Sequence, residues 1–439
     1  MARFRPNQEW RRRSAARRPR IPSNIAPVND LVDRLMAPIE RFVVAAEQSI
    51  ARMVAVPTDR TNRFRGRLGE LATARRLRAW SLVLIAGFWL PALAAPAKGF
   101  WDFSEFYTAG RLVGGPALMN VLDIVRLEES LGLSSVPFVY TPALAWLFVP
   151  ASGLSYALAG WLVMASMLVL LMLAVEIGRR VLGLDWRIAL VGALAWPPAA
   201  VAVVTDQTST LGLLLMAVAC VGLVKGGKWE LLTGLAVAGL AYKLPLALPL
   251  LGLLVLRWKW KALAAACAGL AVVYLLSVAA TGGDWSWPGG WLASANQVVA
   301  LDTVNQWQSI SLTETLGGSP FVYAGLALLG LALLPGLRAR PIQEAVAVGM
   351  VAGLVISPHA LFYDATLALP AIAMLGRRSI PLYILAGIWP LGYVIGFQPL
   401  AFGLAIWLVS ETRLIGRREA WAKQSERAAS LPTAATATA

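Results

Sequence analysis

Residues 154–178, LSYALAGWLVMASMLVLLMLAVEIG, decide the fold class of this chain, and Arg179 and Arg180 follow them directly. An apolar run of this length spans a bilayer as one helix, because about 20 residues at 1.5 Å each cover the hydrocarbon core. Similar runs recur from Trp80 almost to Arg413. Of the 439 residues, 58% are hydrophobic and only 14% are charged, whereas about a quarter are charged in a soluble domain. The sequence therefore predicts an all-α, polytopic integral membrane protein.

The loops between the apolar runs alternate in charge, and this alternation predicts the orientation of the chain. With the basic N-terminus inside, every second loop carries arginine or lysine. We therefore expect about twelve spans in the plasma membrane, with both termini cytoplasmic. Two short runs are expected to turn at Lys243, and the run 138–150 is expected to be re-entrant or to lie at the outer interface. The expected spans are 79–97, 154–178, 188–204, 208–224, 230–242, 244–256, 262–280, 320–336, 342–357, 361–376, 380–396 and 400–410.

Three parts of the chain are expected to differ in character. The net charge of +15 is concentrated in the N-terminal arm and the short loops, which favours anionic membrane lipids as partners. No motif typical of nucleic-acid binding is present. We expect a basic cytoplasmic arm at 1–78, with an amphipathic helix at about 28–54 that lies on the membrane interface or against a protein surface. A transmembrane domain is expected at 79–412, with outer-face loops 98–153 and 281–318. The residues 413–439 are expected to form a disordered cytoplasmic tail.

The first expected outer loop contains two carboxylates, in the sequence GFWDFSEFYTAGR (residues 99–111). Asp102 and Glu105 are three residues apart, so on a helix they share one face. They can supply a base for proton transfer. The alternative is a helix-capping arrangement, in which Asp102 begins the helix and Glu105 completes the cap.

Most other ionisable groups away from the basic loops also fall on the expected outer side. Charged groups at membrane depth cost about 2.5–3.5 kcal/mol each on insertion scales, so they normally line a cavity or pair with one another. We therefore expect one polar cavity opening away from the cytoplasm. Alternatives remain for several residues: Lys243 can extend to lipid headgroups, Asp364 can be the structural partner of a cation, and His359 can be structural. The candidates beside Asp102 and Glu105 are Tyr107, Arg111, Tyr140, Asp206, Gln207, Lys243, Glu314, His359, Tyr363 and Asp364.

Several kinds of site are not indicated by the sequence. It has no metal-ligand spacing, no glycine-rich phosphate loop and no nucleophile elbow. It therefore predicts no metal site and no cofactor, and it does not support a soluble nucleotide substrate.

Five segments, taken in order, resemble glycosyltransferase family 87. The resemblance covers roughly residues 80–412 and leaves out the arm 1–78. The segments are Asp102-Phe-Ser-Glu-Phe-Tyr-Thr-Ala-Gly-Arg111, Phe138-Val-Tyr-Thr-Pro142, Asp206-Gln207, Lys243-Leu-Pro245 and Ser357-Pro-His-Ala-Leu-Phe-Tyr-Asp364.

This resemblance implies the GT-C fold, a polyprenyl-phosphate-linked sugar donor, and an inverting displacement with an acidic base in the first extracytoplasmic loop. Family members include polyprenol-phosphate-mannose-dependent mannosyltransferases. Asp102 matches the base. Lys243, Arg111 and His359 would contact the donor phosphate, and a further set would position substrates: Glu105, Tyr107, Tyr140, Gln207, Tyr363 and Asp364.

The leading hypothesis is a membrane glycosyltransferase that moves a sugar, with mannose favoured, to a lipid or glycolipid acceptor on the extracytoplasmic side. A transporter or lipid flippase without covalent chemistry is the main alternative. Such proteins commonly have internal repeats and midplane polar sites on broken helices, and no repeat is evident here. A non-catalytic scaffold that recruits partners through its N-terminal helix is the third possibility.

Overall fold

The computed structural model describes residues 75–94, 102–134, 136–301, 308–317, 319–357, 359–375, 379–387 and 396–408. The regular structure in these ranges is helical, without a strand, and one isolated antiparallel bridge joins Ser309 to Leu361. The all-α prediction is therefore confirmed for the described part of the chain. The expected amphipathic helix at 28–54, nearly all of the arm 1–78 and the tail 413–439 lie outside the described residues.

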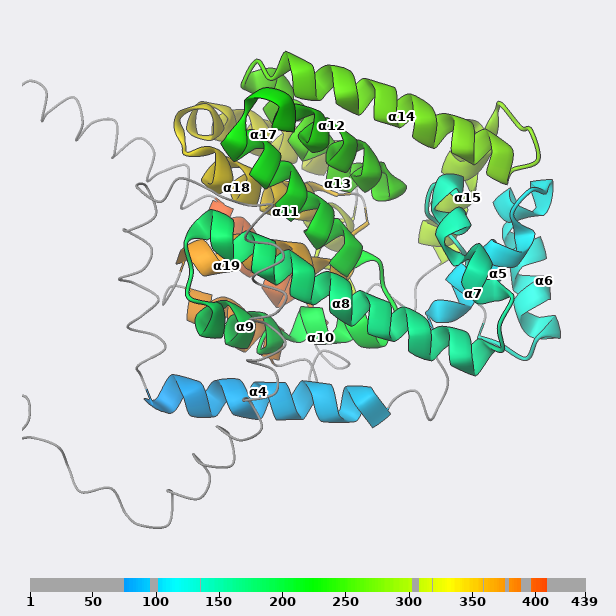
Figure 1. The fold of residues 1–439 in the computed structure, drawn as a ribbon, viewed down its shortest axis with the longest axis horizontal. Helices are drawn as coiled ribbons and strands as arrows, with labels where there is room; N and C mark the ends of the chain where they lie inside the picture. Colours follow the sequence, from blue (N-terminus) through cyan, green and yellow to red (C-terminus); the bar gives the residue numbers. More distant parts are fainter. Residues whose placement is uncertain are drawn as a thin grey trace, which may run out of the picture. The chain divides into compact units, whose positions relative to one another are not determined.

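Long apolar helices make up most of this structure (Figure 1). They carry few charged residues because lipid or other helices surround them, and every backbone polar group of a helix is satisfied within the helix itself. The principal ones are α4 (Arg75–Ala94), α8 (Tyr156–Leu182), α11 (Ser209–Lys225), α12 (Glu230–Gly239), α13 (Leu244–Leu256), α14 (Trp260–Ala280), α17 (Pro320–Ala339) and α18 (Ile342–Ile356).

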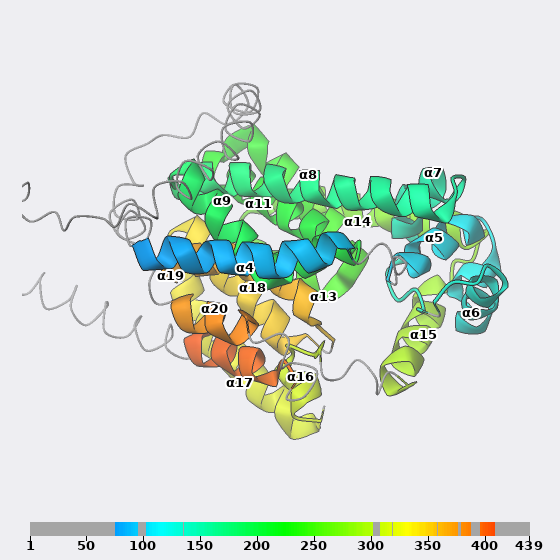
Figure 2. The same ribbon diagram turned by 90° about the horizontal axis from the view of Figure 1, so that it is seen from below.

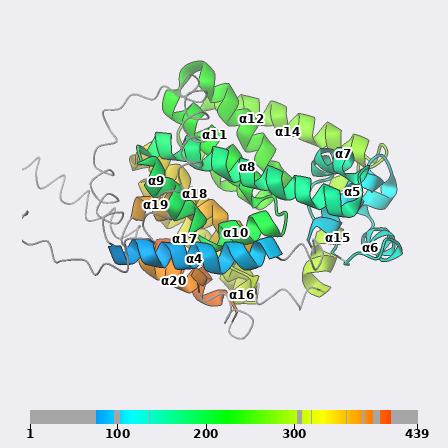
Figure 3. The same ribbon diagram turned by 60° about the horizontal axis from the view of Figure 1, so that its bottom comes forward.

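Shorter elements connect these helices. They include α9 (Trp186–Leu194), α10 (Pro197–Val204), η6 (Gly227–Trp229), η7 (Leu240–Lys243), α16 (Leu312–Thr315), η9 (Phe362–Ala368), α19 (Leu369–Leu375) and α20 (Ile380–Gly387). Helix α4 packs along α10, and α8 packs along α11 (Figures 1 and 3). Figure 2 shows α17 and α20 on the side of the bundle where α16 also lies.

Within the described ranges, four helical stretches are long and apolar enough to cross a membrane, or five if the pair α9 and α10, bent by 68°, is one broken span. Six shorter apolar helices account for other runs expected from the sequence. The described chain therefore has the character of a membrane protein with several spans, while the count of about twelve stays a prediction. The four stretches are Tyr156–Leu182, Gly227–Leu256, Trp260–Ala280 and Pro320–Ala339.

The region around Lys243 differs from the expected pair of spans. Helical elements follow one another without an intervening loop over 30 residues, Gly227–Leu256. Pro245 falls in the first turn of α13, where the missing N–H would have no helical partner in any case, so helix can resume at once. The break is confined to Lys243, whose backbone (φ −126°, ψ 89°) leaves the helical region.

A second group of short helices gathers at the Tyr156 end of α8 (Figure 1). Helix α5 packs against its neighbours on nearly every side, and Phe103 to Gly110 are all buried. Trp291 Nε1 donates to the carbonyl of Val139 at 3.0 Å and Ser294 Oγ to that of Met119 at 2.9 Å, tying α15 to this group. The group comprises α5 (Phe103–Leu112), η4 (Pro116–Met119), α6 (Val121–Ser130), η5 (Pro142–Phe148), α7 (Val149–Ser152) and α15 (Trp287–Leu301).

Small residues allow α12 and α14 to approach each other closely. A Cβ placed on Gly234 would lie 2.2 Å from the carbonyl oxygen of Ala262 and 2.5 Å from Cβ of Ala265. A Cβ on Gly269 would lie 2.6 Å from Cβ of Ala238. Such close packing drives helix association in lipid, because the hydrophobic effect does not favour helix–helix contact over helix–lipid contact there.

We expect Gly234→Ala to destabilise the protein by about 1–3 kcal/mol, the usual cost of overpacking a tight core. The matched control is Gly252→Ala in α13, where a Cβ would meet nothing within 4 Å and helix propensity gains roughly 0.5–1 kcal/mol. Thermal unfolding in detergent, followed by tryptophan fluorescence, compares the two. Equal midpoints for the two variants would contradict the close approach.

Candidate active site

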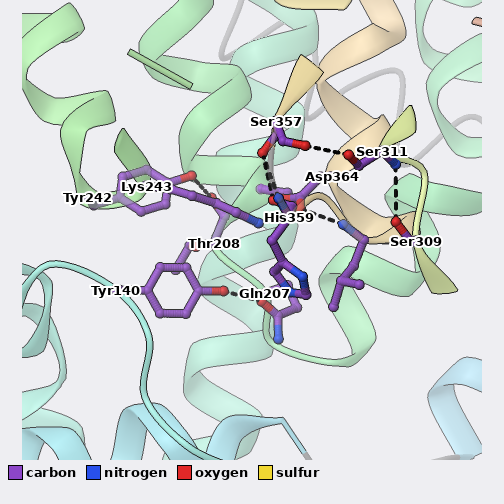
Figure 4. Close-up of polar contacts among 12 residues, drawn as sticks. Tyr140, Gln207, Thr208, Tyr242, Lys243, Ser309, Ser311, Ser357, His359 and Asp364 are labelled. Atoms are coloured by element: carbon purple, nitrogen blue, oxygen red, sulfur yellow. Dashed lines mark hydrogen bonds and ion pairs between the residues drawn. The ribbon is translucent and has the colours of Figure 1, made fainter. Parts of the chain in front are cut away.

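The side-chain amide of Gln207 joins three of the predicted site residues. Gln207 follows α10 and is buried. Its Nε2 donates to Asp102 Oδ2 at 3.1 Å and to Glu105 Oε1 at 3.3 Å. Its Oε1 accepts from the hydroxyl of Tyr140 at 2.8 Å (Figure 4). Both amide hydrogens and the amide oxygen are thus used, which fixes the orientation of the amide.

Asp102 precedes α5 and is half-buried. Its side chain makes no capping hydrogen bond to the helix, so the capping alternative is not the arrangement in the structure. The carboxylate instead faces Gln207.

Glu105 differs from Asp102 in its burial. Burial raises the pKa of Glu105 well above its usual value, and the charge of Asp102 raises it further, while the Gln207 hydrogen bond and the charge of Lys243 lower it. Burial therefore disfavours the charged form of Glu105. Of the two acids in the motif, Asp102 has the more accessible side chain.

A second cluster surrounds Asp364 in η9. The Nζ atom of Lys243 forms an ion pair with Asp364 Oδ2. Ser209 Oγ donates to Oδ1 at 2.9 Å, and the backbone N–H of Leu361 donates to Oδ2 at 3.0 Å. Asp364 is 1% exposed, and three donors compensate its charge there, as a buried carboxylate requires. The Lys243 ammonium also lies 5.5 Å from the centroid of the Tyr363 ring.

The turn from Gln207 to Ser209 connects the two clusters. Gln207 binds the acids, and Ser209, two residues later, binds the ion pair. Between them, the carbonyl of Thr208 accepts from the hydroxyl of Tyr242 at 2.8 Å, next to Lys243 (Figure 4). Segments far apart in the sequence thus meet in one polar network.

His359 enters this region from the segment after α18. Its backbone N–H donates to Ser357 Oγ at 3.3 Å, and Ser357 Oγ donates to the His359 carbonyl at 2.7 Å. Figure 4 draws the imidazole between Lys243 and Gln207 in that view.

Tyr107 and Arg111 lie on the other side of α5. Tyr107 donates to the carbonyl of Leu154 at 2.7 Å, and the Arg111 guanidinium donates to the Tyr107 hydroxyl at 2.8 Å and to the carbonyl of Ser152 at 3.3 Å. Within the described residues, no hydrogen bond or ion pair joins either side chain to Gln207 or Lys243. Their contacts fasten α5 to the junction of α7 and α8.

A family model for glycosyltransferase family 87 matches residues 138–358, half of the chain. The chain belongs to glycosyltransferase family 87. No curated protein matches the sequence. As a member of this family, the protein is a membrane glycosyltransferase. The matched region contains Tyr140, Gln207 and Lys243, while Asp102 and His359 lie outside it.

The network has the groups that a glycosyltransferase needs for sugar transfer. A carboxylate can accept the proton of an attacking hydroxyl, and a cation can stabilise charge that develops on a departing group. Within the described ranges, no three His, Cys, Asp or Glu side chains are placed to share a metal ion.

Sequence reasoning did not assign roles to Asp206 and Ser209. Asp206 is fully buried, and neither carboxylate oxygen has a hydrogen-bond partner among the described residues. Burial, and secondly the charge of Asp102, raise its pKa to about 9, so it carries a proton at neutral pH. Its backbone has φ +58°, a conformation uncommon for a residue with a side chain. The signal was the polar run from Thr205 to Thr210 between two apolar helices.

Glu128 lies in α6, which packs against α5 and its acid motif. Its side chain is buried, Oε2 accepts from the backbone N–H of Val136 at 3.0 Å, and Oε1 has no partner in the described chain. Burial raises its pKa to about 8, although the Val136 N–H and the nearby Ser104 and Thr108 hydroxyls lower it. The folded protein therefore holds this proton more tightly than the unfolded chain does.

This raised pKa predicts a pH-dependent contribution to stability. Between pH 4.5 and about 8 the folded state binds more protons at Glu128 than the unfolded state, so the free energy of unfolding falls as pH rises. Glu128→Gln, a neutral isostere, should remove this contribution. The unfolding midpoint of Glu128→Gln should therefore rise relative to that of the wild type as the pH increases from 5 to 8. The control is Glu129→Gln, at an exposed neighbouring residue. Parallel curves for wild type and Glu128→Gln would contradict the assignment.

Proposed function

We propose that this glycosyltransferase moves a sugar, with mannose the leading candidate, from a polyprenyl-phosphate-linked donor to a lipid or glycolipid acceptor. The reaction inverts the anomeric centre and takes place on the extracytoplasmic side of the plasma membrane. One observation carries the proposal: the turn Gln207–Ser209 connects the carboxylate of Asp102 to the ion pair of Lys243 and Asp364.

Asp102 is the general base in this proposal. An inverting displacement needs a base on the face of the sugar opposite the leaving group. Of the two acids of the motif, Glu105 is buried and its pKa is raised by that burial, whereas Asp102 is half-buried and oriented by the Gln207 amide. The attacking hydroxyl gives its proton to Asp102 as the new glycosidic bond forms.

Lys243 contacts the donor phosphate, which gains negative charge as the sugar leaves. Asp364, itself held by Ser209 and the Leu361 N–H, keeps this lysine side chain in a defined position, so little reorganisation is needed when charge develops. His359 is the further phosphate contact, whereas Arg111 and Tyr107 fasten α5 to the junction of α7 and α8. Substrate positioning is assigned to Glu105, Tyr140, Gln207, Tyr363 and Asp364.

Asp102→Asn should abolish sugar transfer, because the amide is nearly the same size but accepts no proton. With purified protein, a synthetic polyprenyl-phosphate mannose and a phospholipid-linked acceptor, we expect a loss of at least about 100-fold in kcat, the lower range for general-base catalysis. The unfolding midpoint should stay within a few degrees of the wild type.

The control for Asp102→Asn is Asp123→Asn, a partly exposed acid of α6 that pairs with Arg126 at 3.3 Å. It should retain wild-type activity. Full activity of Asp102→Asn would refute the assignment of the base. Donor counterflow in liposomes with no covalent product would instead support a transporter.

Two variants separate a phosphate contact at Lys243 from a purely structural partner of Asp364. Lys243→Met leaves a buried carboxylate unpaired and should destabilise the protein by about 3–5 kcal/mol. Lys243→Met combined with Asp364→Asn removes both charges and should restore most of that stability, yet remain about 100-fold slower in transfer. Recovery of activity in the double variant would mean that Lys243 acts only through the ion pair.

A further inference from the structure

Glu314 of α16 places a carboxylate against His359 that the proposed mechanism does not yet use. Glu314 Oε2 lies 3.5 Å from His359 Nδ1. Both atoms are shielded from solvent, and neither has a hydrogen-bond partner within the described residues. The separation exceeds the usual hydrogen-bond limit of about 3.2 Å by about 0.3 Å, and such contacts often shorten when substrate binds.

The simplest alternative for Glu314 is helix capping, because Ser311-Leu-Thr-Glu314 has the capping-box pattern. Half of that pattern is present: Ser311 Oγ accepts from the backbone N–H of Glu314 at 3.3 Å. In a full capping box, Glu314 would accept the N–H of Ser311. That N–H instead donates to Ser309 Oγ at 3.2 Å. The carboxylate of Glu314 is therefore not used by the cap and turns to the imidazole.

The position of Glu314 relative to His359 is fixed by the backbone. Ile310 N–H donates to the carbonyl of Ala360 at 2.8 Å, and Thr313 Oγ1 donates to that of Ile356 at 2.9 Å. Ser311 Oγ donates to the carbonyl of Ser357 (Figure 4). All three contacts lie on the α16 side of the bridge between Ser309 and Leu361, so together with the bridge they hold α16 in one register against the segment that carries His359.

A carboxylate at one nitrogen of an imidazole decides what the other nitrogen can do. It holds a proton on Nδ1, so the neutral ring has its proton there and Nε2 is the nitrogen available to a ligand. When the ring is charged, Nε2–H becomes a donor and the carboxylate balances the charge. The Nε2 atom of His359 has no partner in the part of the chain that the structure describes, and the side chain is 22% exposed.

We propose that Glu314 is a positioning residue for His359: it accepts from Nδ1–H, which orients the ring and balances the charge of the imidazolium, and so presents Nε2–H to the phosphate group of the donor. The inference rests on the proposed function, which places that phosphate beside Lys243. As the bond from the anomeric carbon to the phosphate oxygen breaks, the electron pair goes to the phosphate. The His359 imidazolium, balanced by Glu314, then donates Nε2–H to it.

The protonation state of His359 can be read directly, because it is the sole histidine of the chain. Protein without a histidine tag, labelled with ¹⁵N-histidine and purified in detergent, gives nitrogen signals from one ring. In the wild type we expect Nδ1 to have the chemical shift of a protonated nitrogen. In Glu314→Ala that shift should move toward a bare or averaged nitrogen, and in Glu314→Gln the move should be smaller, since the amide oxygen still accepts.

The second measurement is transfer from polyprenyl-phosphate mannose. Glu314→Ala should lower kcat about tenfold, less than the loss of about 100-fold or more expected for His359→Ala, which removes the phosphate donor itself. Glu314→Gln should recover part of the rate. Glu129→Gln, which removes an exposed acid of α6, is the control and should match the wild type in both measurements. Unfolding midpoints show whether each variant is folded.

The two proposals fail in different ways. If the wild type transfers no sugar but its nitrogen shifts depend on Glu314, the donor is wrong and the Glu314–His359 pairing stands. If Glu314→Ala leaves the nitrogen shifts unchanged, the positioning role is overturned whatever the activity. If the shifts change while kcat stays at the wild-type value, the pairing has no part in transfer, and the proposal is equally overturned.

Discussion

The structure depends on the requirement that buried polar groups find partners. Gln207 lies in a helical bundle where an unmade hydrogen bond costs about 1–3 kcal/mol, and it satisfies its amide by reaching Asp102, Glu105 and Tyr140. Two residues later, Ser209 does the same for Asp364. A single turn between apolar helices thus specifies how α5, η7 and η9 approach one another. Without these hydrogen bonds, the elements would meet mainly through apolar surfaces, which have little preference for one register.

The same turn separates charges of opposite sign. Two buried acids with raised pKa values, Glu105 and Asp206, lie near the more accessible Asp102. The cation of Lys243 is compensated by Asp364 rather than by these acids. Because the ammonium and Asp102 are not paired with each other, both can serve a substrate that spans the gap: a hydroxyl at one end and a phosphate at the other. Direct neutralisation of Asp102 by Lys243 would have weakened both groups.

The helices followed from apolar runs in the sequence, because membrane helices need little besides length and hydropathy. The polar residues of the site followed in part from their scarcity: a lone histidine or a lysine between apolar stretches has few structural uses in lipid. The direction of each side chain did not follow. Arg111 shares a helix with Glu105, but its guanidinium donates to the carbonyl of Ser152. It also donates to the hydroxyl of Tyr107, which is four residues earlier and so lies on the same face of the helix. Two spans were expected to turn at Lys243; the backbone leaves the helical region there, but helix resumes at once because proline is tolerated in a first helical turn. Partners that come from distant segments, such as Ser209 with Asp364, depend on packing that no local pattern encodes.

The chain order of the contacts has a consequence for biosynthesis. The acids of α5 and Gln207 are synthesised early, whereas Asp364 and His359 come from the last fifth of the chain. A nascent protein that has inserted as far as α17 holds Lys243 without its counter-ion and lacks the histidine. Translation must therefore pass Asp364 before this cation has its buried partner. A ribosome-bound intermediate in the membrane therefore holds an uncompensated lysine until its last helices have been made.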